Sequence, residues 1–404
     1  MTTERVGVCA PAGFRASAAA AGVRGDEHRD RLDVALILSD RPCVAAGVFT
    51  RNLVKAAPVV ISQLTLRRHA DVRAVIVNSG NANACTGPQG FRDALRMATA
   101  TADSCEADPA EVLVCSTGVI GRPLPMERVL DGVRAAAASL SVAGGEAAAR
   151  AIMTTDTVVK TAVASVPIGQ VLCTVGGMAK GAGMIHPDMA TLLAFVTTDA
   201  CVERSALQTM LTDVCSRTFN CLSIDGDTST NDTLLLLANG AAGGAPVTAG
   251  TPEYVALSEA VEEVCTSLVE QLAADAEGAT KSIRVRVAGC ADIEQARAAA
   301  RTVVLSPLVK SAVHGADPNW GRIVAALGRS GASMSLDRCR VLIGGVEVFG
   351  GGRPLPVDLD AIRAVFSEPR VDIDVDLGGG EASGRAWGCD LSPEYVHINA
   401  DYTT

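Results

Sequence analysis

The chain has 404 residues, of which 48% are hydrophobic and 20% are charged, and its formal net charge at pH 7 is −10. A composition this rich in apolar residues excludes a disordered protein, and the length predicts two or more subdomains. The negative charge, with only two Trp, three Tyr and seven Phe, argues against a nucleic acid as partner.

The N-terminal segment and the cysteines predict a cytoplasmic protein that is not bound to a membrane. Glu4 and Arg5 precede a glycine- and alanine-rich run that lacks the apolar core of a signal peptide. No apolar run reaches the roughly 20 residues that a membrane helix needs. The 13 cysteines form no C-x-x-C pair, and we interpret them as reduced thiols, mostly small core residues.

Apolar, β-rich runs alternate with alanine-rich segments along the first half of the chain. This alternation predicts a layered α/β fold, in which the loop at 115–121 follows a strand end, a common place for a site. The predicted elements are a strand at 74–77, a loop at 78–88, a helix at 89–103, a strand at 112–114 that ends at a turn at 116–118, and a helix at 126–140.

The second half shows the same two periodicities. Three glycine-rich stretches, at 238–250, 350–352 and 378–380, predict turns, and the first is a candidate subdomain boundary. The predicted elements are a buried strand after residue 191 that runs to 196, helices at 205–218 and 255–274, and half-buried strands at 282–287 and 371–377.

Motifs of several other protein classes fail on inspection. Lys180-Gly181 reverses the order of a phosphate loop. Residues 225–227 begin like a calcium loop, but Thr230 and Leu236 stand where glycine and glutamate are needed. None of the five histidines is paired at zinc-ligand spacing, and no G-x-S-x-G elbow occurs. We therefore predict no metal site.

Residues 180–193 (KGAGMIHPDMATLL) are the most informative segment. Glycines loosen the backbone before Thr191, and Pro187 stiffens it. A threonine hydroxyl is a weak nucleophile, but an N-terminal threonine carries its own base, an α-amine with a pKa of roughly 8. Cleavage of the Ala190–Thr191 bond would create nucleophile and base together. The alternative is an apolar core segment that follows a glycine loop.

This segment closely resembles the autoprocessing site of the ornithine acetyltransferase family. A chance match at one motif is common, whereas eight matches in the family's order are not. The other matching stretches are residues 48–52, 78–84, 115–121, 151–156, 225–232, 275–278 and 314–322.

The resemblance implies an αββα-like layered sandwich of the kind shared with N-terminal-nucleophile aminopeptidases, with a smaller α/β C-terminal subdomain from about residue 280. It implies self-cleavage into an α chain (1–190) and a β chain (191–404), which in related enzymes pair and associate further, as a heterotetramer or larger. The implied reaction moves acetyl from N-acetylornithine to glutamate through an acetyl ester on Thr191, in a ping-pong cycle that needs no cofactor.

The same resemblance implies the site residue by residue. Thr117 and Gly118 correspond to an oxyanion hole, which stabilises the negative charge that develops on a reacting carbonyl oxygen. For this loop, for Lys180 and for Glu277, the alternative is an ordinary turn and solvated or structural charges. The implied substrate-binding residues are Thr154, Thr155, Lys180, Thr191, Glu277, Asn399 and Thr404.

Two matching stretches stay open in role. Polar side chains in turns usually bond to backbone, so the 225–232 and 314–322 stretches are either loop architecture or part of the site, and we predict no catalytic residue there. The polar residues of the first stretch are Asp225, Asp227, Asn231 and Asp232. His186 stands where many relatives carry another residue, which points to an effect on processing rate rather than on chemistry.

Other activities also remain open. One is a bifunctional form that also takes acetyl from acetyl-CoA, and another is a secondary-metabolism paralogue with a different acyl donor. Two lie in other classes: an autoprocessing amidohydrolase or aminopeptidase with the same nucleophile, and an uncleaved, noncatalytic binding protein.

Overall fold

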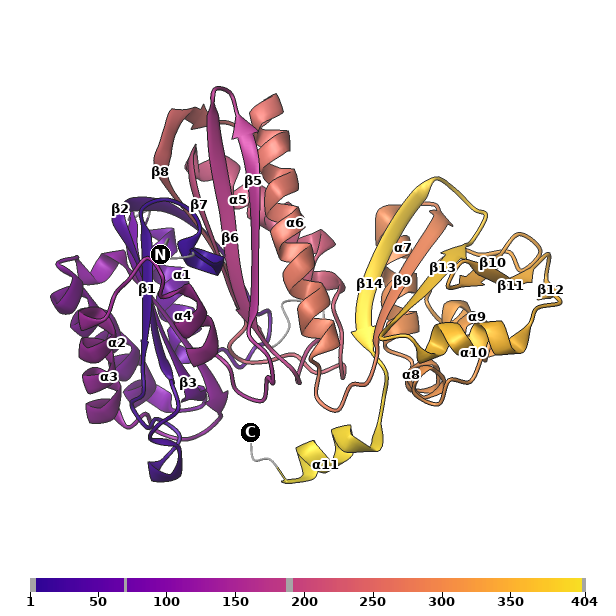
Figure 1. Ribbon diagram of the computed structural model, residues 1–404, viewed down its shortest axis with the longest axis horizontal. Helices are drawn as coiled ribbons and strands as arrows, with labels where there is room; N and C mark the ends of the chain where they lie inside the picture. The colour runs from indigo at the N-terminus through magenta and orange to yellow at the C-terminus, as the bar shows by residue number, and fades with distance from the viewer. Residues whose placement is uncertain (1–4, 69–70, 187–191, 402–404) are drawn as a thin grey trace.

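The computed structural model describes residues 5–68, 71–186 and 192–401, which form two lobes (Figure 1). An eight-stranded sheet builds the first lobe. Its strands are β1 (Phe14–Ala19), β2 (Val34–Phe49), β3 (Val72–Asn81), β4 (Val112–Val119), β5 (Lys160–Ile168), β6 (Val171–Lys180), β7 (Leu193–Val202) and β8 (Thr233–Val247). Its helices are α1 (Ala57–Arg67), α2 (Gly87–Cys105), α3 (Met126–Ala138), α4 (Gly145–Ala151), α5 (Arg204–Arg217) and α6 (Pro252–Ala274).

The long strand β2 belongs to both halves of this sheet. Its first part pairs with β1 and β3, and its last part pairs with β8, so the order is β4-β3-β2-β8-β7-β6-β5. Side chains of the two halves, such as Ile37, Val75 and Phe195, share one buried cluster and form the inner layer. The two halves therefore pack on each other as a sandwich.

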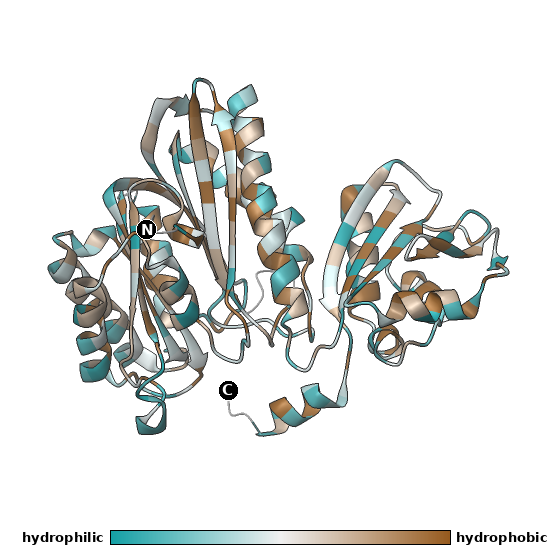
Figure 2. Ribbon diagram, in the orientation of Figure 1, coloured by the Kyte–Doolittle hydropathy of each residue, from teal (hydrophilic) through white to brown (hydrophobic). Residues whose placement is uncertain are grey.

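Helices cover the outer faces of this sandwich. Met97 of α2 and Val129 of α3 pack on β2, β3 and β4, while α5 and α6 pack on the half that contains β7 and β8. Figure 1 shows α2 and α3 at one side of the strands and α6 at the other. Figure 2 shows hydrophobic residues along the strands between them. These four layers confirm the predicted αββα-like sandwich.

The second lobe is a smaller α/β unit with a six-stranded sheet. Ile283, Val285 and Val287 of its first strand face a buried cluster, as their alternation predicts, and α7 to α10 pack against that face. Its strands are β9 (Ser282–Cys290), β10 (Arg340–Ile343), β11 (Val346–Gly350), β12 (Arg353–Pro354), β13 (Arg370–Asp376) and β14 (Ala382–Cys389). Its helices are α7 (Ile293–Val304), α8 (Pro307–His314), α9 (Trp320–Gly328) and α10 (Leu359–Ser367), and α11 (Pro393–Asp401) follows β14.

The predicted turn and subdomain boundary at 238–250 is wrong for most of its length. Strand β8 continues to Val247, because its glycines adopt conformations that produce bulges rather than a reversal. Gly240 and Gly243 have positive φ angles of 67° and 79°, and the β7–β8 register shifts beside them. The turns predicted at 350–352 and 378–380 are confirmed.

The predicted end of the strand at 116–118 is also wrong. Strand β4 continues to Val119 because Gly118 pairs with Gly80 of β3 in parallel register. The other helix and strand predictions agree with the structure to within a few residues. No helix in the described part of the chain is long and apolar enough to span a membrane.

Candidate active site

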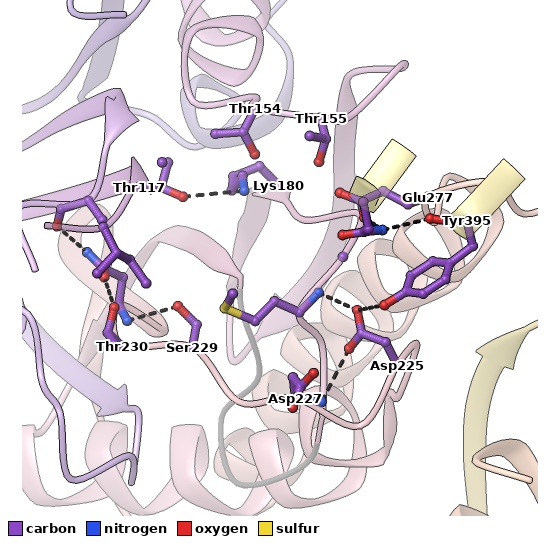
Figure 3. Close-up of a pocket in the computed structure, with 17 residues that line it drawn as sticks. Thr117, Thr154, Thr155, Lys180, Asp225, Asp227, Ser229, Thr230, Glu277 and Tyr395 are labelled. Carbon is purple, nitrogen blue, oxygen red and sulfur yellow. Dashed lines mark hydrogen bonds between the residues drawn. The ribbon is translucent and has the colours of Figure 1, made fainter. Parts of the chain in front are cut away.

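A pocket opens in the first lobe where segments from distant parts of the chain meet (Figure 3). Its walls come from the end of β4, the segment after α4, the end of β6, the 225–232 loop, the segment after α6 and helix α11. The predicted site residues Ala190, Thr191 and Thr404 lie outside the described residues. The other predicted site residues all line this pocket: Thr117, Gly118, Thr154, Thr155, Lys180, Glu277 and Asn399.

The Thr117–Gly118 corner is fixed by a close approach of two strands. Gly118 has a φ of 134°, and a Cβ atom there would lie 2.3 Å from the carbonyl carbon of Gly80. Only glycine allows this approach, which leaves the Thr117 side chain at the pocket wall. The Thr117 hydroxyl accepts a hydrogen bond from Lys180 Nζ at 3.4 Å, so its own proton is available for a ligand.

Asn231 ties this corner to the neighbouring loops. Its Nδ2 donates to the carbonyl oxygens of Ala82 (2.7 Å) and Ser116 (2.8 Å), and the Ser116 hydroxyl donates to Asn78 Oδ1 (2.6 Å). All four residues are buried. The matching stretches at 78–84, 115–121 and 225–232 are therefore parts of one hydrogen-bonded unit.

A cluster of buried charged side chains lies next to Lys180. Lys160 Nζ donates to Asp156 Oδ1 (2.8 Å) and to Asp275 Oδ2 (2.5 Å), and Lys180 Nζ lies 4.0 Å from Asp156 Oδ2. The two lysines and two aspartates balance in charge, and each of the four side chains is at least nine-tenths buried. Asp156 also accepts from the backbone N–H of Gly181 at 2.7 Å.

Burial and charge act in opposite directions on these groups. Burial raises the pKa of Asp156, but the charges of Lys180 and Lys160 outweigh it and lower that pKa to about 2. Burial also lowers the pKa of Lys180, while the charge of Asp156 opposes this shift. Asp156 thus stays ionised and keeps a cation at the pocket wall.

The opposite wall is acidic. Glu277 Oε2 accepts from Asn399 Nδ2 at 2.9 Å, and the Tyr395 hydroxyl donates to Asp225 Oδ2 at 3.3 Å. Burial raises the pKa of Asp225. The pocket can therefore bind a small molecule that carries an anionic group at one end and a cationic group at the other.

Sequence reasoning missed several of these groups. Lys160 and Tyr395 both lie outside the matching motifs. A usable signal was present for Tyr395, because it lies four residues before Asn399 and residues at that spacing share a helix face. Asp225, whose role the sequence left open, lines the pocket together with Asp227.

The 314–322 stretch lies in the second lobe and does not line this pocket. His314 Nδ1 lies 2.8 Å from Asp390 Oδ2, and Lys281 Nζ donates to the His314 carbonyl oxygen at 2.9 Å. These contacts join the end of α8 to the chain entering β9. The stretch therefore joins α8 to α9 within the second lobe.

His186 Nδ1 lies 3.1 Å from the Ser223 hydroxyl. Within residues 5–68, 71–186 and 192–401, no group of three or more His, Cys, Asp or Glu side chains is arranged to hold a metal ion.

Comparison with known proteins decides the family, since residues 15–404 match the ArgJ family. This chain belongs to the ArgJ family. It is 51% identical over 398 residues to the arginine biosynthesis bifunctional protein ArgJ of Symbiobacterium thermophilum, with 98% of each chain covered. It is 48% identical over 404 residues to that of Deinococcus radiodurans, with 100% of each covered. The family resemblance is confirmed, and this ArgJ protein is an enzyme, an acyltransferase.

A solved structure agrees with the assignment. The crystal structure of arginine biosynthesis bifunctional protein ArgJ from Bacillus halodurans is 40% identical, with a TM-score of 0.50. The match covers 98% of that chain and 52% of this one.

Asp156→Asn tests the charge cluster. We expect it to lower the free energy of unfolding at pH 7 by about 3 to 5 kcal/mol, because buried ammonium groups lose their counter-charge. Since the folded-state pKa of Asp156 lies below the unfolded value, its stabilisation is present above pH 3.8 and is lost as the pH falls toward 2. Urea unfolding between pH 2 and pH 7 measures both effects.

Glu146→Gln is the control for that experiment. It removes an exposed ion pair to Arg150 at 2.9 Å, which we expect to change the free energy by less than about 1 kcal/mol. Equal losses in the two variants would contradict a structural role for the buried cluster.

Gly118→Ala tests the strand approach. We expect a lower melting temperature and a loss of about 1 to 3 kcal/mol from overpacking against Gly80, in addition to backbone strain. Gly121→Ala is the matched control, because Gly121 also has a positive φ (80°) but no atom lies within 4 Å of the added Cβ. If the two variants had the same melting temperature, steric contact with Gly80 would not be the reason that residue 118 must be glycine.

Proposed function

We propose that this ArgJ enzyme transfers an acetyl group from N-acetylornithine to glutamate through an ester on Thr191. The observation that carries the proposal is the polarity of the pocket, with Lys180 on one wall and Glu277 and Asp225 on the other. N-acetylornithine has a carboxylate and a side-chain ammonium, and these suit Lys180 and Glu277 respectively. The position of the pocket supports it too, because Leu192 and β7 start beside the 225–232 loop.

The proposal includes self-cleavage between Ala190 and Thr191. The Thr191 hydroxyl oxygen attacks the Ala190 carbonyl carbon, the C–N bond breaks, and the hydroxyl proton passes to the released amine. Water then hydrolyses the ester, which leaves a carboxylate on Ala190 and restores the hydroxyl. The α chain is residues 1–190 and the β chain is residues 191–404.

The length of the Bacillus halodurans chain supports this cleavage. Nearly all of that chain aligns, yet it covers only 52% of this one. A β chain of residues 191–404 would likewise be about half of the precursor. We propose that the two chains pair and associate further into a heterotetramer.

In the transfer cycle, the neutral α-amine of Thr191 takes the hydroxyl proton while the oxygen attacks the acetyl carbonyl carbon. Donors at Thr117 and Gly118 stabilise the resulting oxyanion, each by about 3 to 4 kcal/mol. The C–N bond of N-acetylornithine breaks, the proton passes to the leaving amine, and ornithine departs. The α-amine of glutamate then attacks the ester and leaves as N-acetylglutamate.

The name of the relatives gives specific support to a second activity, because it calls them bifunctional. We propose acetyl-CoA as a second acetyl donor to the same Thr191, which would make N-acetylglutamate without N-acetylornithine. A secondary-metabolism paralogue would differ in its acyl donor, and an amidohydrolase would release acetate without an acceptor.

Thr191→Ala tests the nucleophile. Denaturing mass spectrometry of the wild-type protein should show two species, the second beginning Thr-Leu-Leu-Ala-Phe. The variant should stay a single species of about 41.4 kDa and lose acetyl transfer, because it lacks the attacking hydroxyl. Thr209→Ala, at an exposed position of α5, should be processed and active like wild type. Acetyl transfer at the wild-type rate by Thr191→Ala would sink the proposal.

The donor is tested by supplying glutamate with either N-acetylornithine or acetyl-CoA. We expect ornithine release with the first donor, and coenzyme A release with the second if the enzyme is bifunctional. Acetate release that does not need glutamate would instead identify a hydrolase. Each product is measured by mass spectrometry at equal enzyme concentration.

A further inference from the structure

A cavity of about 500 Å³ lies between the two lobes and is separate from the candidate active site. Strands β9 and β14 of the second lobe lie beside helix α6 of the first lobe there (Figure 1). One wall comes from α5, α6 and the turn that contains Cys221, and the other comes from β9, β13, β14 and α7. This interlobe cavity and the pocket that contains Lys180 have different lining residues.

The interlobe cavity is strongly cationic. Five arginines and two carboxylates, Glu262 and Asp374, line it, which leaves an excess of three positive charges. The whole chain has a net charge of −10, so its composition alone would not produce such a cavity. Clustered guanidinium groups bind carboxylates and phosphates, because each planar fork donates two parallel hydrogen bonds. The five arginines are Arg217, Arg284, Arg286, Arg297 and Arg385.

The arginines of β9 face the cavity because side chains alternate along a strand. Val285 and Val287 face the buried core of the second lobe, so Arg284 and Arg286 project from the opposite face of the sheet. On the neighbouring strand, Arg385 lies directly opposite Arg286 in antiparallel register. Like charges in directly opposed positions destabilise a sheet, so this pair favours an anion between the two strands.

The protein neutralises only some of these arginines. Arg217 Nε and Arg385 Nη2 share one carboxylate, since they lie 2.9 Å and 2.8 Å from the two oxygens of Glu262. Arg286 and Asp374 are in register on β9 and β13, yet neither forms an ion pair with any residue in the described part of the chain. The exposed Arg286 side chain is therefore available to a ligand.

A second unpaired donor lies close to this cluster. Trp387 is only 2% exposed, and its Nε1 has no hydrogen-bond partner among the described residues. The Arg385 guanidinium lies 4.8 Å from the centre of the Trp387 ring. Trp387 and Arg370 line an adjoining cavity of about 290 Å³, which shares Arg284 with the first one. Unpaired donors beside a cavity suit a ligand that brings acceptor atoms.

We propose that the interlobe cavity binds the phosphate groups of a nucleotide-sized ligand, with Arg286 as a principal contact. A cavity of about 500 Å³ falls in the range of roughly 300 to 1,000 Å³ that holds such ligands. A single phosphate ion would fill only a small part of it. A terminal phosphate carries about −1.5 to −2 charges at pH 7, so two phosphate groups balance the excess positive charge of the wall.

The phosphate groups can come from coenzyme A or from a free nucleotide. Cys221 lines the interlobe cavity and Asp225 lines the active-site pocket. Four extended residues span at most about 14 Å, and the pantetheine arm of coenzyme A has a similar length of about a dozen chain atoms. One acetyl-CoA molecule is therefore long enough to reach between the two walls. Only this assignment to coenzyme A rests on the proposed function.

Isothermal titration calorimetry of the full protein with coenzyme A, ADP or sodium phosphate tests the site. We expect coenzyme A and ADP to bind more tightly than phosphate, and less tightly as salt rises, because the contacts are ionic. Arg286→Ala should weaken their binding about tenfold through the loss of a charge-assisted hydrogen bond. Arg286→Glu should weaken it by more than about a hundredfold, because it adds a like charge.

Arg353→Ala is the matched control. Arg353 is another exposed strand arginine of the second lobe that forms no ion pair with a described residue. It lies on β12, at the opposite edge of the sheet from β14. We expect this variant to bind coenzyme A and ADP as the wild-type protein does.

The comparison of ligands identifies the source of the phosphates. Tighter binding of coenzyme A than of ADP, with a higher KM for acetyl-CoA in Arg286→Ala, would assign the site to the acetyl donor. Equal or weaker binding of coenzyme A would assign it to a free nucleotide.

Three results would overturn the inference. They are no binding of coenzyme A or ADP at millimolar concentration, equal affinity for phosphate and ADP, and unchanged binding in Arg286→Glu. If neither compound bound and Arg286→Glu changed the particle mass measured by light scattering, the cavity would instead be an interface between copies of the chain. Calorimetry requires neither cleavage nor acetyl transfer, so failure of the proposed function would leave this test intact.

Discussion

The Asp156 carboxylate is the constraint on which the pocket depends. It pairs with Lys160, lies 4.0 Å from Lys180 and accepts backbone hydrogen bonds from Thr154 and Gly181, so it ties two pocket segments to one buried charge. Replacing such buried ion clusters with apolar side chains is often neutral or stabilising. We therefore infer that this cluster serves to place Lys180 and Thr154 rather than to increase the net stability of the fold.

The folding of the sheet over β2 brings these segments together. Because β2 pairs with β3 in one half and with β8 in the other, the ends of β4 and β6 meet at one edge of the sandwich. The 225–232 loop precedes β8 and enters the same edge. The pocket is thus a consequence of sheet topology, with α11 returning from the second lobe to close one side (Figure 1).

Most helices and strands could be predicted from the sequence, because hydrophobic periodicity is a property of neighbouring residues. The alternation at 282–287 and the helical spacing at 255–274 are both confirmed. The turn predicted at 238–250 was wrong because glycines with positive φ angles occur in β-bulges as well as in turns. Contacts between distant residues, such as Lys160 with Asp275 or Tyr395 with Asp225, leave no local pattern. The site residues that the structure brings together were predicted only from the family resemblance. That resemblance did not include Lys160 and Tyr395, which form hydrogen bonds beside them.

The β6–β7 pairing would allow the fold to tolerate the proposed cut at 190–191. These strands are antiparallel neighbours, and Lys180 pairs with Leu193, so residues 181–192 connect two strands that are already hydrogen-bonded to each other. Cutting such a connection removes only a loop-closure constraint, which changes slowly with loop length. Six cross-strand pairs remain between β6 and β7, and Asp225, on the far side of the cut, still holds Met184 and Ile185. The sheet would therefore keep the described residues on both sides of the proposed cut, Ile185 and Leu192, in their places.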